Sequence, residues 1–486
     1  MVSRREIKKR IDATEERFLE CWDVLYTLRV ATEASDQVAH AIIGFQERLA
    51  EPLFELEICR TQLNKEKRRL VSGKARLNSQ WFSRRMRTLS AYDKALNGAI
   101  AIGKALGDAF AWFFYKKERE FLSQHLSRPM VFHVPCGVGG RAELEFIRKV
   151  KQIEGRFVLH HATTTILRLG DFSLFDLKTM RLIAIGEMKS RRADEDTIES
   201  LISFTAVDPS VFQDMNHSSA GPTWNPVPLR EAFPADILAG LRRQLKSTAE
   251  TFKEVYGRVD KRKISMQMDW PISDLERLVA EFSGKRLAWR QVGSSLVLLA
   301  YRLGHRRLFG GLLNNRPPKF GNEVVDPAVS IVSGTPKRFN SLTISVILYD
   351  GKNGEPTLPH GMIPLFWWPL DLAFLKSVYL RQVALVSIFN PAHILCRLEK
   401  MGFTVTADYS RRLFQAEKTI GKGILSVGES LPYMFHLVAS HLFDEDAVIS
   451  IFEQAMEKTA QGMTGNAKIE LEIIREFADN GMPSQD

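Results

Sequence analysis

The 486-residue sequence has few of the features that mark secreted, zinc-binding or disulfide-rich proteins. Its four cysteines lie far apart and form no C-x-x-C pair, which argues against a zinc site of the usual spacing and against a disulfide framework. The basic N-terminus contains no apolar segment of the kind found in a signal peptide. These absences favour the reducing cytoplasm as the compartment.

Long hydrophobic runs are also scarce. The best candidate for a membrane span is 96–115, but it carries Lys104 and Asp108 near its centre, and each charge would be costly in lipid. We therefore expect a buried helix there and no membrane contact. A phosphate-binding P-loop is missing too, because the glycine-rich segment 419–430 lacks the required spacing.

Positive charge is present in excess, with a formal net charge of +10. Eleven Lys or Arg against two acids lie between Arg60 and Lys94, a local net charge of +9, and aromatic residues are interleaved with them. One interpretation is a surface for a phosphate backbone. The alternative is a solvated basic helix face whose aromatics lie in the core. The candidate nucleic-acid-binding residues here are Lys67, Arg68, Arg69, Arg84 and Arg85.

Three regions are expected along the chain. Apolar residues recur at helical spacing through 1–130, which predicts a basic helical bundle or a long hairpin. Proline and glycine break this pattern, and 131–207 then follows the order helix, three strands, helix, with helices expected at 141–155 and 193–207. The remainder, 230–486, alternates helical and strand-like segments, which predicts a mixed α/β region of one or two subdomains.

The hairpin expected within 170–190 carries an unusual set of charged residues. Its midpoint at residue 179 would fold Asp171 back beside Glu187. Glu187 and Lys189 are two residues apart on a strand, so their side chains point to the same face. Asp176, at the turn end, is better interpreted as a turn residue. We therefore expect an aspartate, a glutamate and a lysine at one place.

Two neighbouring carboxylates repel each other unless a cation joins them, and oxygen ligands suit Mg²⁺ or Mn²⁺. Asp171 followed by "EMK", residues 187–189, resembles the PD-(D/E)xK nuclease superfamily. The resemblance covers about 137–200 and implies a restriction-endonuclease-like mixed-sheet core. The family's proline is absent, because Gly170 precedes Asp171.

The resemblance implies that Asp171 and Glu187 bind the metal and that Lys189 assists the attacking water. It also implies a third acid on the preceding helix. Glu143 is our candidate, because it shares a helical stripe with Phe146 and Ile147, whereas Glu145 points further round. Arg191 and Arg192 follow the lysine and are candidates for contact with the phosphates that flank the scissile bond.

The expected protein is thus an α+β or α/β multidomain chain and a metal-dependent nuclease acting on DNA, although nothing in the motif separates DNA from RNA. The resemblance further implies frequent dimerisation and an association with prokaryotic or mobile-element defence or DNA processing. Two alternatives remain. Glu187 and Lys189 form a solvated edge pair, or the chain is a non-catalytic nucleic-acid-binding or interaction protein with a nuclease-like fold.

Overall fold

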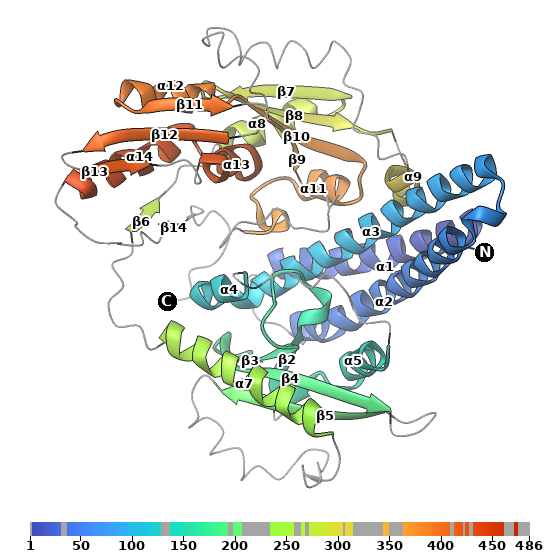
Figure 1. The fold of residues 1–486 in the computed structure, drawn as a ribbon. Coiled ribbons are helices and arrows are strands. Elements are labelled where there is room, and N and C mark those ends of the chain that lie inside the picture. Colours follow the sequence, from blue (N-terminus) through green and yellow to red (C-terminus); the bar gives the residue numbers. More distant parts are fainter. Residues whose placement is uncertain are drawn as a thin grey trace.

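The chain folds as a mixture of helices and sheets with a helical N-terminal region (Figure 1). The structure is a computed structural model that describes residues 2–30, 36–126, 128, 137–153, 155–192, 198–206, 234–256, 264–267, 272–304, 307–313, 344–348, 363–408, 413–420, 423–426, 431–460 and 471–474. Among these residues, no helix is both long enough and apolar enough to cross a membrane.

Three long helices form a bundle at the centre of the molecule. They are α1 (Arg4–Val30), α2 (Asp36–Ser72) and α3 (Ser79–Tyr115), with a short 3-10 helix η1 (Lys74–Arg76) between the last two. Their apolar stripes pack against one another, as the helical spacing of 1–130 predicts. The Asn78 side chain caps α3 by accepting hydrogen bonds from the backbone N–H groups of Gln80 and Trp81. A short helix, α4 (Arg119–Leu126), follows the bundle.

The second region is a five-stranded sheet in the strand order of the sequence. All its strand pairs are antiparallel, so the mixed sheet expected from the family resemblance is not seen among these strands. One face packs against α5 and the other against α3 of the bundle, and α7 contacts β4 and β5. The elements are α5 (Val138–Lys149), β1 (Gln152–Ile153), β2 (Arg156–His160), η2 (His161–Thr163), β3 (Phe172–Asp176), β4 (Arg181–Arg192), β5 (Ile198–Ala206) and α7 (Ala235–Tyr256).

The helix expected at 193–207 is wrong where it can be compared, because Ile198–Ala206 forms the strand β5, while 193–197 and 207 lie outside the described residues. β4 continues well past the end of β3, and β5 supplies partners for its free backbone groups, pairing Glu187 with Ser203 and Lys189 with Leu201. Isoleucine and phenylalanine on alternate positions favour this arrangement. β4 is therefore an interior strand.

The helix expected at 141–155 is α5, but it begins at Val138 and ends at Lys149. Gly155 does not close it. This glycine has a φ of +74° and lies in the turn between β1 and β2. The short strand β1 occupies the residues in between, where pairing with β2 satisfies the backbone better than another helical turn.

The C-terminal region combines short helices with small sheets, as its alternating pattern predicts. Its largest sheet has four strands in the order β7-β8-β10-β9, and a three-stranded sheet joins β11, β12 and β13. The elements are β6 (Ile264–Gln267), α8 (Ile272–Phe282), β7 (Leu287–Val292), β8 (Leu296–Arg302), α9 (Leu308–Leu313), β9 (Ile344–Leu348), η6 (Leu365–Trp367), α11 (Leu372–Tyr379), β10 (Val383–Phe389), α12 (Ala392–Lys400), β11 (Thr404–Asp408), β12 (Leu413–Ile420), β13 (Gly423–Ser426), α13 (Leu431–His441), α14 (Glu445–Ala460) and β14 (Leu471–Ile474).

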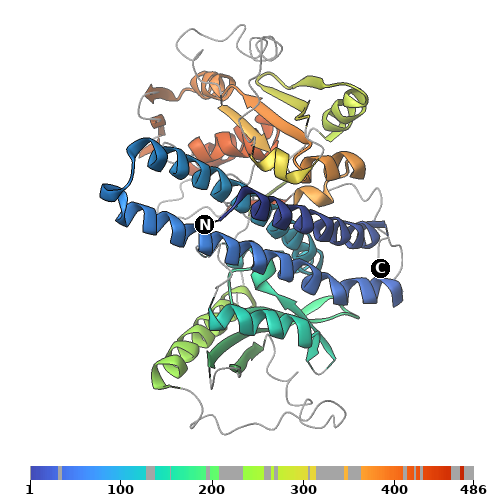
Figure 2. The same cartoon turned by 90° about the vertical axis from the view of Figure 1, so that its right-hand side faces the viewer.

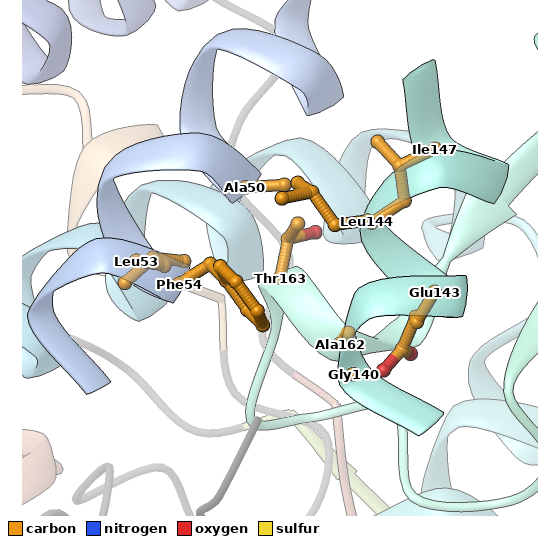
Figure 3. Close-up of a pocket in the computed structure, with 9 residues that line it drawn as sticks. All are labelled: Ala50, Leu53, Phe54, Gly140, Glu143, Leu144, Ile147, Ala162 and Thr163. Atoms are coloured by element: carbon orange, nitrogen blue, oxygen red, sulfur yellow. The ribbon is translucent and has the colours of Figure 1, made fainter. Parts of the chain in front are cut away.

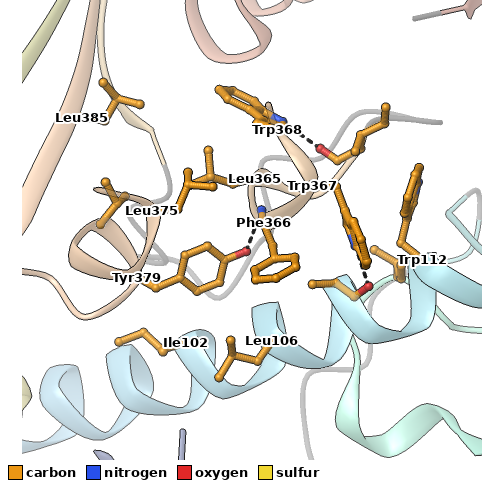
Figure 4. Packing of buried hydrophobic residues seen from close by; sticks show 14 of the residues in the cluster. Ile102, Leu106, Trp112, Leu365, Phe366, Trp367, Trp368, Leu375, Tyr379 and Leu385 are labelled. Carbon is orange, nitrogen blue, oxygen red and sulfur yellow. Dashed lines mark hydrogen bonds between the residues drawn. The ribbon is translucent and has the colours of Figure 1, made fainter. Parts of the chain in front are cut away.

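The bundle lies between the five-stranded sheet and the C-terminal region in both views (Figures 1 and 2). One hydrophobic cluster includes residues from all three regions. Trp367 illustrates the contact, because its ring packs against Trp112 and its indole N–H donates a hydrogen bond to the Ala109 carbonyl of α3 at 2.8 Å (Figure 4). The three regions therefore share a core.

Candidate active site

The β3–β4 hairpin brings together the residues expected from its sequence. Phe172 pairs with Gly186, Ser173 with Ile185 and Leu174 with Ala184, so the same register places Asp171 opposite Glu187. Asp176 is the last residue of β3 and accepts hydrogen bonds from Lys178 and Thr179 in the turn, so it lies at the turn end of the hairpin as expected.

Gly170 gives this end of the hairpin its shape. Its φ is +77°, and a Cβ there would lie 2.4 Å from the Ile185 side chain. Proline cannot adopt such a φ, and other side chains would clash. The departure from the family's proline therefore has a local cause, since the backbone turns sharply before Asp171.

Asp171 is held by the neighbouring strand. Its backbone N–H donates to the Gly186 carbonyl at 2.8 Å, and its Oδ2 accepts a hydrogen bond from the Met188 N–H at 2.6 Å. The hairpin register places its carboxyl group beside that of Glu187, and the charge of Asp171 acts on the pKa of Glu187. The Lys189 Nζ lies 3.6 Å from Glu187 Oε2. Asp171, Glu187 and Lys189 thus form one contiguous group, called the acid–lysine cluster below.

Burial makes this cluster electrostatically unfavourable when both acids are ionised. Glu187 is only 4% exposed, so it is not part of a solvated edge pair. Burial, and then the nearby Asp171, raise the pKa of Glu187 to about 7, while Lys189 acts in the opposite direction. Burial also raises the pKa of Asp171. At neutral pH a proton or another cation between the two carboxylates is therefore favourable.

Glu143 faces the same end of the sheet from α5. It lines a shallow pocket with Phe54 of α2 and with Ala162 and Thr163 of η2 (Figure 3). Burial, followed by repulsion from Asp171, raises the pKa of Glu143 to about 7. Glu145 instead forms ion pairs with the flanking Arg148 and Lys149 at the surface. The helix therefore turns Glu143, and not Glu145, towards the cluster.

Two buried charged residues of α3, Lys104 and Asp108, lie close to these acids and are not part of the motif. Lys104 donates hydrogen bonds to the carbonyls of Ala162 and, at 3.3 Å, Thr164, and its charge also acts on Glu143. Asp108 accepts two hydrogen bonds from Thr165, at 2.5 and 2.6 Å. The sequence contains a signal for these contacts, because charged residues inside an apolar helix need buried polar partners.

A chain of buried hydrogen bonds fixes the turn before Asp171. His125 Nδ1 accepts from two backbone N–H groups, so its Nε2–H donates to the Tyr115 hydroxyl at 3.2 Å. Tyr115 then donates to Ser173 at 2.7 Å, and Ser173 donates to His161 Nε2 at 2.6 Å. The remaining His161 N–H donates to the Gly170 carbonyl at 2.9 Å. Burial lowers the pKa of His161 to about 4, which keeps its ring neutral.

The two arginines after Lys189 differ in their surroundings. Arg191 forms an ion pair with Glu199 of β5 at 2.7 Å. Arg192 is exposed and lines a cleft of about 530 Å³ with Arg141 and residues of α2. The other candidate nucleic-acid-binding residues fall into two groups. Lys67 forms an ion pair with Asp93, and Arg85 forms one with Glu66. The side chains of Arg68, Arg69 and Arg84 are exposed.

The donor atoms suit a hard divalent cation. Asp171 and Glu187 present carboxylate oxygens side by side, and Glu143 adds a third carboxylate whose pKa is raised by the charge of Asp171. Within the described ranges, however, no three His, Cys, Asp or Glu side chains lie close enough together to hold a metal ion. The pair of hairpin carboxylates is therefore the part of the site that fits Mg²⁺ or Mn²⁺.

No protein-family model, curated protein or solved structure matches the chain.

The raised pKa of Glu187 predicts that this residue lowers the folding stability of the protein at alkaline pH. A carboxyl group whose pKa rises on folding stabilises the protein at low pH, and this stabilisation is lost as the pH rises from about 4.5 to about 7. Glu187→Gln should therefore increase the free energy of unfolding at pH 8 by up to about 3 kcal/mol relative to the wild type. Its unfolding temperature should rise accordingly. The gain should shrink towards pH 5 in thermal unfolding measurements.

Glu145→Gln is the matched control. Ion pairs with Arg148 and Lys149 lower the pKa of Glu145, so the same substitution should give no gain at pH 8. A Glu187→Gln variant that is less stable than the wild type at pH 8 would contradict the account of a strained carboxylate pair.

Proposed function

We propose that the chain is a divalent-metal-dependent nuclease that hydrolyses phosphodiester bonds in DNA. The observation that supports it most is the acid–lysine cluster, in which two neighbouring carboxyl groups and a lysine lie at one end of the hairpin. Structural ion pairs seldom leave two carboxylates facing each other in a buried place, whereas metal-dependent hydrolytic sites require it. The resemblance of the same residues to the PD-(D/E)xK pattern supports the same reaction.

Each residue has a role in this proposal. Asp171 and Glu187 would hold Mg²⁺ or Mn²⁺, and Glu143 would complete the acidic set from α5. When bound, the ion would supply Lewis-acid stabilisation of charge on the phosphate. Lys189 would orient the attacking water and stabilise negative charge on the phosphoryl oxygens as the water oxygen bonds to phosphorus and the ester oxygen leaves. Arg192 would contact a flanking phosphate.

Metal-dependent cleavage is the direct test. Purified protein is expected to nick or linearise supercoiled plasmid DNA with Mg²⁺ or Mn²⁺, and to leave it intact with EDTA. Asp171→Asn should lose this activity, because the amide keeps the acceptor for the Met188 N–H but lowers the negative charge. The same assay with RNA determines which polymer is cut.

Asp176→Asn is the control for that test. It makes the same chemical change at the turn end of the same hairpin, so cleavage should continue. If the wild type cuts neither DNA nor RNA with either metal, the non-catalytic alternative replaces this proposal. If Asp171→Asn cuts as fast as Asp176→Asn, the assignment of Asp171 to the active site is wrong.

A further inference from the structure

The connection between α2 and α3 forms a basic projection at one end of the bundle. We call residues 65–94 the basic tip; it comprises the end of α2, η1 and the start of α3. In both views it points away from the two sheet regions (Figures 1 and 2). α1 also begins here, because Arg85 donates a hydrogen bond to the Val2 carbonyl and Glu66 accepts one from the Val2 N–H.

The acids of this segment are already neutralised within the bundle. Glu66 pairs with Arg85 at 2.5 Å, and Asp93 pairs with Lys67 at 2.7 Å. All four side chains are largely buried, with exposed fractions between 13% and 26%. These two pairs join α2 to α3, so Lys67 and Arg85 serve the fold.

The other cations have no such partner. Of the eleven between Arg60 and Lys94, Arg60 pairs with Glu57, and Lys67 and Arg85 are engaged as above, which leaves eight. In the part of the chain that the structure describes, none of the eight forms an ion pair, and all are exposed. They are Lys65, Arg68, Arg69, Lys74, Arg76, Arg84, Arg87 and Lys94.

This surface differs from that of α5, another helix with several basic residues. On α5, Arg148 pairs with Glu51 and Glu145, so the charges there balance. Like charges gathered without acids repel one another, and a polyanion relieves this repulsion by replacing bound counterions. Trp81, 41% exposed in the first turn of α3, adds an aromatic surface among the cations.

The tip lies at a definite distance from the candidate active site. Phe54 of α2 lines the pocket of Glu143, and Arg69 follows it on the same helix. A helix rises about 1.5 Å per residue, so the two lie about 22 Å apart along α2. This corresponds to about six base pairs of a duplex, at about 3.4 Å each.

We propose that the basic tip binds the sugar–phosphate backbone of a duplex and so provides a second contact on the nucleic acid that the active site cuts. The choice of partner rests on the proposed function, since a nuclease site makes a nucleic acid the relevant polyanion. Cations on α2, η1 and α3 surround the tip, an arrangement that suits a grooved, phosphate-lined surface more than a flat lipid surface.

Binding without cleavage tests the tip separately from the active site. The full chain, with EDTA present, is titrated against labelled DNA and RNA duplexes of about 30 base pairs, which span both contact points. The tip variant combines Arg68→Gln, Arg69→Gln and Arg84→Gln. The control combines Arg242→Gln, Arg243→Gln and Lys246→Gln, three exposed cations of α7, and therefore removes the same charge.

The tip variant should bind at least about tenfold more weakly than the control, and its slope of log affinity against log salt should fall by up to about three units. If the tip variant loses more affinity for one of the two duplexes, the tip prefers the sugar of that duplex, deoxyribose or ribose. Equal binding by the two variants would overturn the inference even if the nuclease activity is real. It would also be overturned if the tip variant kept its duplex affinity but lost binding to vesicles of phosphatidylcholine and phosphatidylserine.

Discussion

The Lys189→Ala variant is expected to cut DNA at least about a thousand-fold more slowly than the wild type while binding it almost equally well. The reason is positional. Lys189 Nζ lies 3.6 Å from Glu187, which under the proposed function binds the metal, so its charge would lie beside the reacting phosphate. It would contribute little to the proposed binding surface, which consists mainly of exposed arginines and lysines of the basic tip. Single-turnover cleavage rates with Mg²⁺, compared with dissociation constants in EDTA, separate the two effects.

Lys178→Ala is the matched control for this variant. Lys178 is exposed in the turn at the opposite end of the same hairpin, so the same charge is lost from the same element. Its cleavage rate should stay within about twofold of the wild type, as for most surface substitutions. If Lys189→Ala and Lys178→Ala cut at the same rate, the assignment of Lys189 is wrong.

Gly107→Ala should lower the free energy of unfolding by at least about 3 kcal/mol. A Cβ on Gly107 would lie 1.8 Å from the Thr163 carbonyl oxygen, and that oxygen belongs to backbone that cannot rotate away. α3 and η2 would have to separate, which also strains the hydrogen bonds of Asp108 to Thr165. Urea unfolding measures the loss, and cleavage activity should fall with it because η2 adjoins Asp171.

Gly240→Ala in α7 is the corresponding control. A Cβ there meets no atom within 4 Å, so the substitution should be neutral or stabilise the protein by about 0.5–1 kcal/mol through helix propensity. If Gly107→Ala were as stable as Gly240→Ala, the close approach of α3 to η2 would be wrong.

The sequence was most informative where the structure is local. The hairpin register depends on one turn and on strand alternation, so the spacing of Asp171 and Glu187 was enough to place them opposite each other. The inward direction of Glu143 followed in the same way from helical periodicity.

Local sequence patterns do not predict contacts between residues that are far apart in the chain. β5 was mistaken for a helix because the decisive interaction is the free edge of β4, which no window around residues 198–206 contains. Lys104 was recognised as a charge in an apolar helix, but its partners at Ala162 and Thr164 lie far along the chain. The histidine network also depends on distant residues, because Tyr115 contacts Ser173 and His125 contacts Arg168.

The two sides of α3 have different neighbours. Ala109 and Trp112 contact Trp367 of the C-terminal region, while Lys104 and Asp108 hold the segment that leads to Asp171. The adjacent residues Asp108 and Ala109 thus contact two distant parts of the chain. A substitution of Trp367 that displaces α3 should therefore also displace the segment that leads to Asp171.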